Sequence, residues 1–274
     1  MQARASIVVI GDEILDGHTQ DTNSGWMARR LASAGVPVDR VVTVPDDPAA
    51  IGEALGAELR RSRPRLLLTS GGIGSTPDDL TMSAVAAHLG VGLSAHPILD
   101  ARIDAWAQQA AADGMAIPED QLAAMRRMAQ VPDGAYLLAG TRGVTPGVAV
   151  DRGGGVEEPS GATIVILPGV PEELTRIVEH GVEPVLARIG SPVHVREVRH
   201  PYPESMLSPL LSELGREHPD VALGSYPGRE CLLRLKGPAD EVARVEARVR
   251  ERLEALAGDA VATRLSARWQ ARWE

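Results

Sequence analysis

The sequence predicts an α/β protein, with a three-layer αβα domain built on a mostly parallel sheet and a smaller C-terminal α+β domain. Three observations support this prediction. Short apolar runs rich in β-branched residues alternate with segments of helical period through residues 1–190. The order then changes to β-α-β-β-α over residues 191–258, which leaves a tail of residues 259–274. The length of 274 residues suits one large domain and one small one.

The first half of the chain contains three strand–helix repeats. The run SIVVI has the character of a buried parallel strand, and the helical positions after Trp26 end at Gly35, where a C-terminal glycine is expected. Pro48 follows two aspartates and fits the first turn of a helix. The alternation predicts a parallel sheet with helices on both faces. We expect strands at 6–10, 36–44 and 65–70 and helices at 26–34, 48–59 and 81–89.

The rest of the chain adds a hairpin and the smaller domain. Residues 145–151 and 162–169 flank a turn through Gly153–Gly155, which predicts a β-hairpin. Trp269 and Trp273 suggest that the tail packs back on the chain or contacts a partner. We expect helices at 99–112, 118–130, 171–190, 203–215 and 240–258, and strands at 194–200, 221–227 and 230–237.

Composition narrows the classes of partner. The formal net charge is −9, and only Lys236 among the 28 basic residues is a lysine, which gives no electrostatic basis for nucleic-acid binding. The single cysteine, Cys231, excludes an internal disulfide. No signal peptide precedes the first predicted strand, and no apolar run approaches the roughly 18 residues of a membrane span. We therefore expect a cytoplasmic protein with no nucleic-acid or membrane partner.

A glycine-rich loop, GGIGSTPDD, follows the third predicted strand. Gly71, Gly72 and Gly74 would let the backbone approach a ligand closely, and the free N–H groups of the next helix would favour an anion. The loop lacks the Gly-Lys-Ser/Thr ending of a Walker A motif, and its glycine spacing does not match the dinucleotide fingerprint. The structural alternative is an ordinary strand-to-helix turn with Asp78 or Asp79 as N-cap.

Pairs of acidic residues follow three strands that are predicted to run in the same direction. These pairs are Asp12/Glu13, Asp46/Asp47 and Asp78/Asp79. The carboxyl ends of parallel strands meet at one edge of a sheet, so we expect the three pairs to converge. Three pairs exceed what helix capping requires. Carboxylates repel a phosphate unless a hard cation bridges them, so the loop and the acids together predict a metal–phosphate complex.

Two further segments are expected at the same edge. Thr22 and Asn23 in DTNS could hydrogen-bond a ligand or simply begin a helix. LPGVPEE could add backbone amides beside the site, or start its helix with Pro171 in the first turn. The seven histidines show no zinc-ligand spacing, and no G-x-S-x-G elbow occurs. Nucleophilic catalysis by a side chain therefore has no candidate, whereas a metal-activated water does.

In combination, GDEIL, GHTQDTN, VPDD, TSGGIGSTPDDLT, TPG and LPGVPEE resemble the motifs of the molybdopterin-binding fold shared by MogA, MoeA and the N-terminal part of CinA. The resemblance covers about residues 5–185. The smaller domain, with PES at 203–205 and LGSYP at 223–227, resembles the second domain of CinA-type proteins and part of the molybdopterin-binding-like domain of eukaryotic FAD synthase. The C-terminal deamidase domain of full-length CinA has no counterpart here, so deamidation of nicotinamide mononucleotide is not expected.

The resemblance implies a site at the strand ends. In the molybdopterin enzymes, acids of the GDE, PDD and DD motifs surround the pterin phosphate, the nucleotide and the metal. Those positions are Glu13, Asp46 and Asp79 here, with Asp12 and Asp78 adjacent. CinA-type relatives instead cleave the pyrophosphate of ADP-ribose, and the FAD synthase domain hydrolyses FAD, both with a divalent metal.

The sequence departs from the family pattern in the glycine-rich loop. Ser75 stands where Pro commonly precedes the Thr, which is a mild change. Pro77 stands where CinA-type loops often carry Lys, which removes a phosphate contact and weighs against hydrolase activity.

We therefore predict a divalent-metal-dependent hydrolase of a nucleotide pyrophosphate such as ADP-ribose or FAD. The alternatives are a molybdopterin-binding enzyme of cofactor biosynthesis, which adenylates the pterin or inserts molybdate, and a non-catalytic nucleotide-binding module. Glu13, Asp46 and Asp79 are the predicted catalytic residues, and Asp46 and Asp79 would hold Mg²⁺, Mn²⁺ or Co²⁺. The family forms dimers or trimers, so we expect a homo-oligomer. The predicted ligand-binding residues are Gly11, Asp12, Asn23, Ser70, Gly71, Gly72, Gly74, Ser75, Thr76, Asp78, Thr81, Pro168, Gly169 and Pro171.

Overall fold

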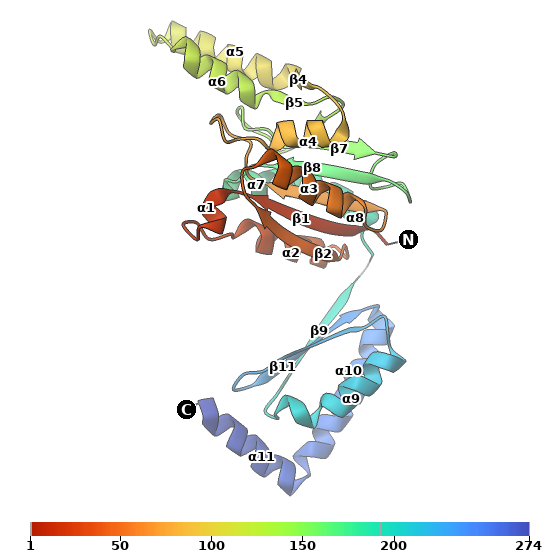
Figure 1. Ribbon diagram of the computed structural model, residues 1–274. Coiled ribbons are helices and arrows are strands. Elements are labelled where there is room, and N and C mark those ends of the chain that lie inside the picture. The colour runs from red at the N-terminus through yellow and green to blue at the C-terminus, as the bar shows by residue number, and fades with distance from the viewer. Residues whose placement is uncertain (1, 192, 274) are drawn as a thin grey trace. The chain divides into compact units, whose positions relative to one another are not determined.

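The structure, a computed structural model, describes residues 2–191 and 193–273 (Figure 1). The chain divides into two compact units, residues 1–191 and residues 192–274, and each is described by itself. The sequence places the boundary one residue earlier, after residue 190.

A six-stranded sheet forms the centre of the first unit. β1, β2, β3 and β8 are parallel, whereas β7 pairs antiparallel with β8 and β6 antiparallel with β7. The mostly parallel sheet and the hairpin predicted from the sequence are therefore confirmed. In spatial order the strands are β2 (Val38–Val44), β1 (Arg4–Ile10), β3 (Arg65–Ser70), β8 (Ala162–Leu167), β7 (Val148–Arg152) and β6 (Tyr136–Leu137).

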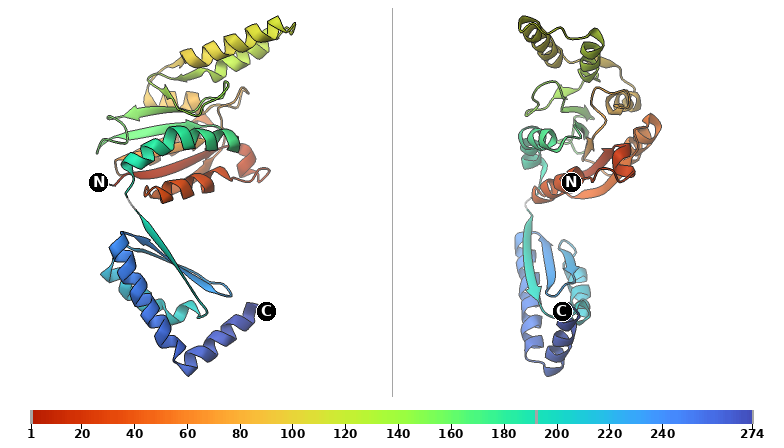
Figure 2. Two further views of the ribbon diagram at one scale, coloured as in Figure 1. Left: turned by 180° about the vertical axis from the view of Figure 1, so that it is seen from behind. Right: turned by 90° about the vertical axis from the view of Figure 1, so that its left-hand side faces the viewer.

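Helices cover both faces of this sheet, as the views in Figure 2 show. Alternate residues of each central strand point to opposite faces, so Ile7 packs in one hydrophobic cluster and Val8 in the other. Burial of one such side chain stabilises the fold by about 1.5–3 kcal/mol. The first cluster includes α2 (Asn23–Ser33), α7 (Pro171–Ile177), a π-helical turn (Val178–Val182) and α8 (Glu183–Ile189). The second includes α3 (Pro48–Leu59), α4 (Thr81–Leu89) and α5 (Pro97–Ala112).

A helical hairpin extends the second face. α5 and α6 (Glu119–Met128) are joined to the sheet layer through a two-stranded antiparallel sheet, β4 (Leu93–Ala95) with β5 (Gln130–Pro132). Arg126 of α6 pairs with Asp100 and Asp104 of α5, which ties the two helices together.

The order of strands creates a switch point between β1 and β3. The chain passes from β1 to β2 on one side, and then crosses to β3 on the other side of β1. Connections that leave a switch point in opposite directions open a crevice at the carboxyl ends of the strands, where ligands bind in α/β proteins. The loops after β1 and β3 begin at Gly11 and Gly71, so both predicted ligand loops flank this crevice.

The opposite end of the sheet holds a buried network of charges. Arg65 is fully buried and donates to Ser6 Oγ and to Asp39 Oδ2, both at 2.7 Å. Ser6 Oγ donates in turn to buried Glu58 at 2.7 Å. A hydrogen bond from Arg4, which outweighs the opposing effect of burial, and a further bond from Arg65 hold the pKa of Asp39 below its usual range.

This network predicts a stability change in acid. The folded-state pKa of Asp39 is depressed, so its carboxylate contributes to the free energy of unfolding at pH values above the ordinary carboxyl pKa of about 4. This contribution is lost as pH falls through the folded-state pKa. We expect Asp39→Asn to be less stable than the wild type at pH 7, and the gap to narrow below about pH 4. Urea unfolding from pH 7 to pH 3 measures this, with exposed Asp120→Asn as a control that follows the wild type. A constant gap across that range would contradict the role of Asp39.

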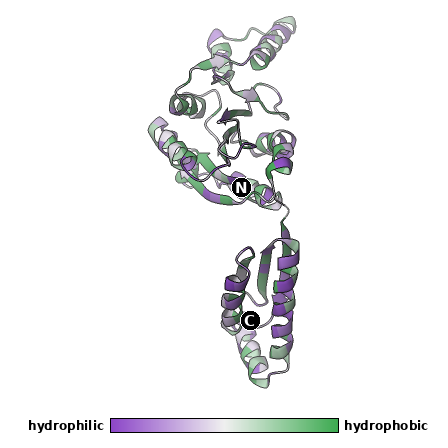
Figure 3. Ribbon diagram, turned by 90° about the vertical axis from the view of Figure 1, so that its right-hand side faces the viewer, coloured by the Kyte–Doolittle hydropathy of each residue, from purple (hydrophilic) through white to green (hydrophobic). Residues whose placement is uncertain are grey.

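The second unit is a three-stranded antiparallel sheet with helices. Its order β9-α9-β10-β11-α10 matches the predicted order, and the strands lie as β10-β11-β9. Hydrophilic and hydrophobic residues alternate along α10 (Figure 3), whose buried residues include Val242, Val245 and Val249. The elements are β9 (His194–His200), a 3₁₀ turn (Glu204–Met206), α9 (Ser208–Glu217), β10 (Ala222–Tyr226), β11 (Cys231–Gly237) and α10 (Ala239–Ala257).

The segment predicted as a tail is helical and packs within the second unit. It forms α11 (Ala260–Gln270) and a short 3₁₀ turn (Ala271–Trp273). Asp259 caps α11, because its side chain accepts from Val261 N at 2.7 Å. Ser266 Oγ donates to Pro201 O at 2.9 Å, and Trp269 Nε1 donates to Gly228 O at 3.2 Å. Across the residues that the structure describes, no helix is long and apolar enough to cross a membrane.

Candidate active site

The glycine-rich loop after β3 has a left-handed backbone, which favours glycine, at two positions. Gly71 has φ +105° and Gly72 has φ +63°. A Cβ on Gly71 would lie 2.1 Å from the carbonyl oxygen of Ile10, at the end of β1. Thr81 of α4 holds the loop in place, because its hydroxyl donates to Gly71 O at 2.8 Å and its N–H donates to Gly72 O at 2.9 Å. The loop therefore lies directly against the end of β1 at the switch point.

Asp46, in the loop after β2, reaches the same place. Its Oδ2 accepts from the backbone N–H of Asp12 at 2.9 Å, and its Oδ1 would lie 3.4 Å from a Cβ on Gly72. Burial is the main cause that raises the pKa of Asp46, and the negative charges of Asp12, Glu13 and Asp78 raise it further. Acids from the other two strand ends, after β1 and after β3, thus act on Asp46. Its neighbour Asp47 instead caps α3 by accepting from Ala50 N at 2.8 Å.

The side chain of Asp79 points back into the glycine-rich loop to which it belongs. Its carboxylate accepts from Gly74 N at 2.5 Å, from Thr76 N at 2.8 Å and from the Thr76 hydroxyl at 2.5 Å. A Cβ on Gly74 would lie 2.6 Å from this carboxylate, so Gly74 makes room for it. The alternative in which Asp78 or Asp79 caps α4 is wrong, because Leu80 is the N-cap residue and no side chain caps it. Hydrogen bonding by Thr76 lowers the pKa of exposed Asp78.

A small cavity lies on the other side of Gly71, between the loop after β1 and the start of α7. Its volume is about 130 Å³. Glu13 lines it and folds back over Gly11, where a Cβ would lie 2.7 Å from the Glu13 carboxylate oxygens. The predicted residues Asn23, Ser70, Gly71, Gly169 and Pro171 also line the cavity, together with Thr19, Gln20, Asp21 and Thr22.

Asn23 joins three parts of this cavity. Its side-chain amide donates to Gly169 O at 2.7 Å and to Ser70 Oγ at 3.1 Å, and Ser70 Oγ donates to Pro168 O at 3.3 Å. Asp21 meanwhile accepts from Ser24 N at 3.0 Å. The segment DTNS therefore both begins α2 and connects the strand ends.

Replacement of Asn23 with alanine should remove two hydrogen bonds that hold the 168–169 turn to β3. We expect the free energy of unfolding to fall by about 1 kcal/mol, and the affinity for a phosphate-containing ligand to fall several-fold. Chemical unfolding and ligand titration of Asn23→Ala measure the two effects. Ser33→Ala, a change at an exposed hydroxyl on the same helix, is the control. Unchanged stability would show that the Asn23 bonds do not hold the turn.

Arg127 of α6 contacts the glycine-rich loop, and no motif in the sequence indicates this contact. Its guanidinium Nη2 donates to the carbonyl oxygen of Ser75 at 2.9 Å. It is exposed and lies 52 residues away along the chain, so no local motif connects it to the loop. Arg127 brings positive charge to a loop in which Pro77 replaces the expected Lys.

The surroundings of Asp46 fit a hard cation that also binds a phosphate. Residues 2–191 and 193–273 contain no group of three or more His, Cys, Asp or Glu side chains arranged to hold a metal ion, so the protein provides no complete cage. Mg²⁺ is usually held by one or two carboxylates, and water and substrate phosphates complete its shell. Asp46, whose negative charge is disfavoured by burial and by its acidic neighbours, is the carboxylate that a cation would stabilise.

Comparison with known proteins agrees with this architecture. A family described as "probable molybdopterin binding domain" matches residues 6–188. A relative from Aeropyrum pernix is 37% identical over 260 residues, which is 92% of this chain and 91% of the relative. A CinA-like protein from Salinibacter ruber is 34% identical over 95% of this chain, which spans 65% of that protein. The crystal structure of the protein CinA from Thermoplasma acidophilum superposes with a TM-score of 0.55 and 30% identity, covering 68% of this chain and 98% of that one.

Proposed function

This chain belongs to the family of CinA-like proteins with a probable molybdopterin binding domain, and we propose that it is a divalent-metal-dependent hydrolase of a nucleotide pyrophosphate such as ADP-ribose or FAD. One observation carries the proposal. The carboxylate of Asp46, with its raised pKa, lies beside left-handed Gly72 in the loop that follows β3, next to the switch point between β1 and β3. Anionic phosphate and acidic side chains can share that crevice when a cation joins them.

Different residues would bind the phosphates, hold the metal and orient the attacking water. The N–H of Gly71 already donates to Leu167 O, and the Thr76 hydroxyl donates to Asp79. The backbone at Gly72 and the side chain of Ser75 would therefore hold the phosphates, and Arg127 would add positive charge at the same loop. Asp46 would hold the divalent cation, which when bound neutralises phosphate oxygens and lowers the pKa of bound water. Glu13 would orient the attacking water from the side of the small cavity.

Asp79 receives a different assignment from the one that the sequence suggests. Both of its carboxylate oxygens already accept hydrogen bonds from the loop. We therefore assign Asp79 the task of fixing the phosphate-binding loop, and Asp46 the metal. In the reaction, water would add to one phosphorus of the pyrophosphate and the bridging P–O bond would break. ADP-ribose would yield AMP and ribose 5-phosphate, and FAD would yield AMP and FMN.

The test is to incubate the purified protein with ADP-ribose or FAD and Mg²⁺, Mn²⁺ or Co²⁺, and to quantify AMP by chromatography. We expect AMP to accumulate only with a divalent cation, and chelation by EDTA to stop it. No AMP above the level produced by Asp46→Asn with any of the three cations would reject the proposal. The expected dimer or trimer is a separate prediction, and light scattering on the same preparation tests it.

A molybdopterin ligand is the second candidate, because the family description names it. A pterin phosphate would use the same glycine loop and the same acidic residues. Fluorescence of the ligand released by denaturation distinguishes the two. A pterin that co-purifies, combined with no AMP formation, would favour a role in cofactor biosynthesis, whereas tight nucleotide binding without turnover would favour a binding module.

A further inference from the structure

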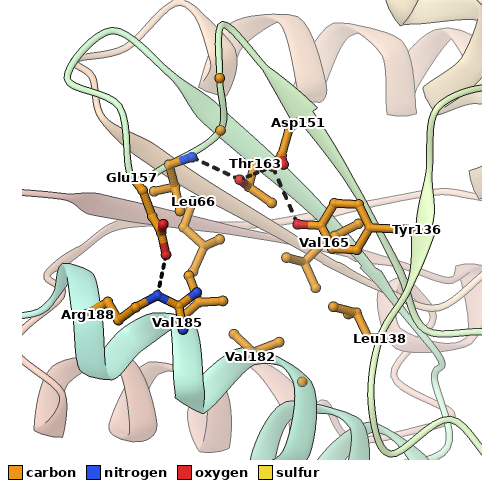
Figure 4. Close-up of a pocket in the computed structure, with 15 residues that line it drawn as sticks. Leu66, Tyr136, Leu138, Asp151, Glu157, Thr163, Val165, Val182, Val185 and Arg188 are labelled. Atoms are coloured by element: carbon orange, nitrogen blue, oxygen red, sulfur yellow. Dashed lines mark hydrogen bonds and ion pairs between the residues drawn. The ribbon is translucent and has the colours of Figure 1, made fainter.

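A second cavity in the first unit lies away from the strand-end loops. It has a volume of about 170 Å³ and lies on the face of the sheet that α7 and α8 cover (Figure 4). Thr163 lies near the start of β8, and Leu66 near the start of β3, whereas the phosphate-binding loop follows the ends of these parallel strands. The cavity is therefore separate from the proposed active site.

The floor of this cavity is aliphatic. β3 and β8 contribute side chains from the sheet, and the π-helical turn and α8 contribute side chains from the helix layer. Figure 4 shows Asp151 and Thr163 above these apolar groups, with Glu157 and Arg188 on one side of them and Tyr136 on the other. A cavity of about 150 Å³ with an apolar lining can hold benzene. The floor consists of Leu66, Leu138, Val165, Val182 and Val185.

The rim of the cavity carries an excess of one negative charge. Glu157 is neutralised by Arg188, whose Nε donates to its Oε1 at 2.5 Å. Asp151 accepts from the Thr163 hydroxyl at 2.5 Å and from the Tyr136 hydroxyl at 3.5 Å. Within the described part of the chain Asp151 has no cationic side chain in ion-pair distance. Its carboxylate is therefore the group on the rim that can still receive a positive charge.

The backbone and the ring beside Asp151 support a built site. Gly155 has φ +83°, and a Cβ there would lie 2.9 Å from the Asp151 carboxylate, so glycine at this position leaves room for the exposed Asp151 side chain beside the loop. Burial, followed by the negative charge of Asp151, raises the pKa of Tyr136, which keeps the phenol protonated and able to donate. The Tyr136 ring offers a face that attracts cations.

We propose that this cavity binds a small primary amine, with its ammonium group on Asp151 and Tyr136 and a compact apolar body of about six to nine non-hydrogen atoms on the aliphatic floor. The volume limits the size of the body. The carboxylate of Asp151 favours a cation over a neutral or anionic ligand of the same shape, because an anion beside it would be repelled.

Isothermal titration with three probes of one shape tests the charge preference. Benzylamine, benzyl alcohol and benzoate differ mainly in the charge of the polar group. We expect benzylamine to bind at least tenfold more tightly than benzyl alcohol, and benzoate to show no binding. Equal affinity for the amine and the alcohol, or no binding of the amine at millimolar concentration, would overturn the proposal.

Two variants and a control locate the binding. Asp151→Asn can still accept from Thr163 but should lose the preference for benzylamine, and Val185→Phe should fill the cavity and abolish binding. Asp120→Asn removes an exposed carboxylate on α6 and should bind as the wild type does. Melting temperatures of all variants show whether they are folded. Benzylamine binding that both Asp151→Asn and Val185→Phe retain would place the amine elsewhere and reject the site. Hydrolysis of ADP-ribose is not needed for any of these measurements, so failure here is distinct from failure of the proposed activity.

Discussion

Asp46→Asn should lower the metal-dependent hydrolysis of ADP-ribose or FAD by at least about 100-fold, because loss of groups that merely support a metal ligand already costs about 10–100-fold. The same change should not weaken the fold. Burial and the neighbouring carboxylates raise the pKa of Asp46, so its charged form is less favourable in the folded chain than in the unfolded one. The neutral amide removes that cost at pH 7 and can still accept from Asp12 N.

The charge of Asp46 should affect the pH dependence of stability in the opposite direction to that of Asp39. A raised folded-state pKa destabilises the fold at high pH, and the cost disappears as pH falls through that pKa. Asp46→Asn should therefore melt at or above the wild-type temperature at pH 7, and the difference should vanish in acid. Divalent cation with ADP-ribose should raise the melting temperature of the wild type more than that of the variant. An unstable Asp46→Asn protein, or one with full activity, would contradict the assigned role.

Gly71→Ala should reduce stability and activity together. The position has φ +105°, a conformation that costs a non-glycine residue about 1–3 kcal/mol, and the added methyl would lie 2.1 Å from Ile10 O. The backbone must move to relieve this contact, so we expect the free energy of unfolding to fall by about 2–4 kcal/mol. Displacement of the loop amides should also abolish phosphate binding. Chemical unfolding and nucleotide titration measure the two losses.

Gly90→Ala is the matched control for this prediction. Gly90 ends α4 with φ +68°, and a Cβ there would meet nothing within 4 Å. This variant should carry only the penalty of the left-handed conformation, about 1–2 kcal/mol, and should leave nucleotide binding unchanged. Equal losses in the two variants would mean that the contact between Gly71 and Ile10 is not tight in solution.

Much of the architecture could be predicted because its signals are local. The β-branched run at 6–10, the helix-ending Gly35 and the glycines of the 71–74 loop each depend on a few neighbouring residues. The direction of a single side chain depends on contacts distant in sequence. For this reason the sequence did not predict that Asp79 would turn into its own loop, nor that Arg127 would reach Ser75 from α6.

By itself the sequence determined the alternation of strands and helices, and therefore which loops meet at the carboxyl ends of the sheet. The tertiary structure decided what each member of an acidic pair contacts: Asp46 lies beside Gly72, whereas Asp47 caps a helix. It also decided that Asp151, Tyr136 and Arg188 share a cavity on the α7–α8 face. The physical reason is that periodicity specifies the face of an element, whereas a cavity or a shared charge arises only when packed elements bring distant side chains together.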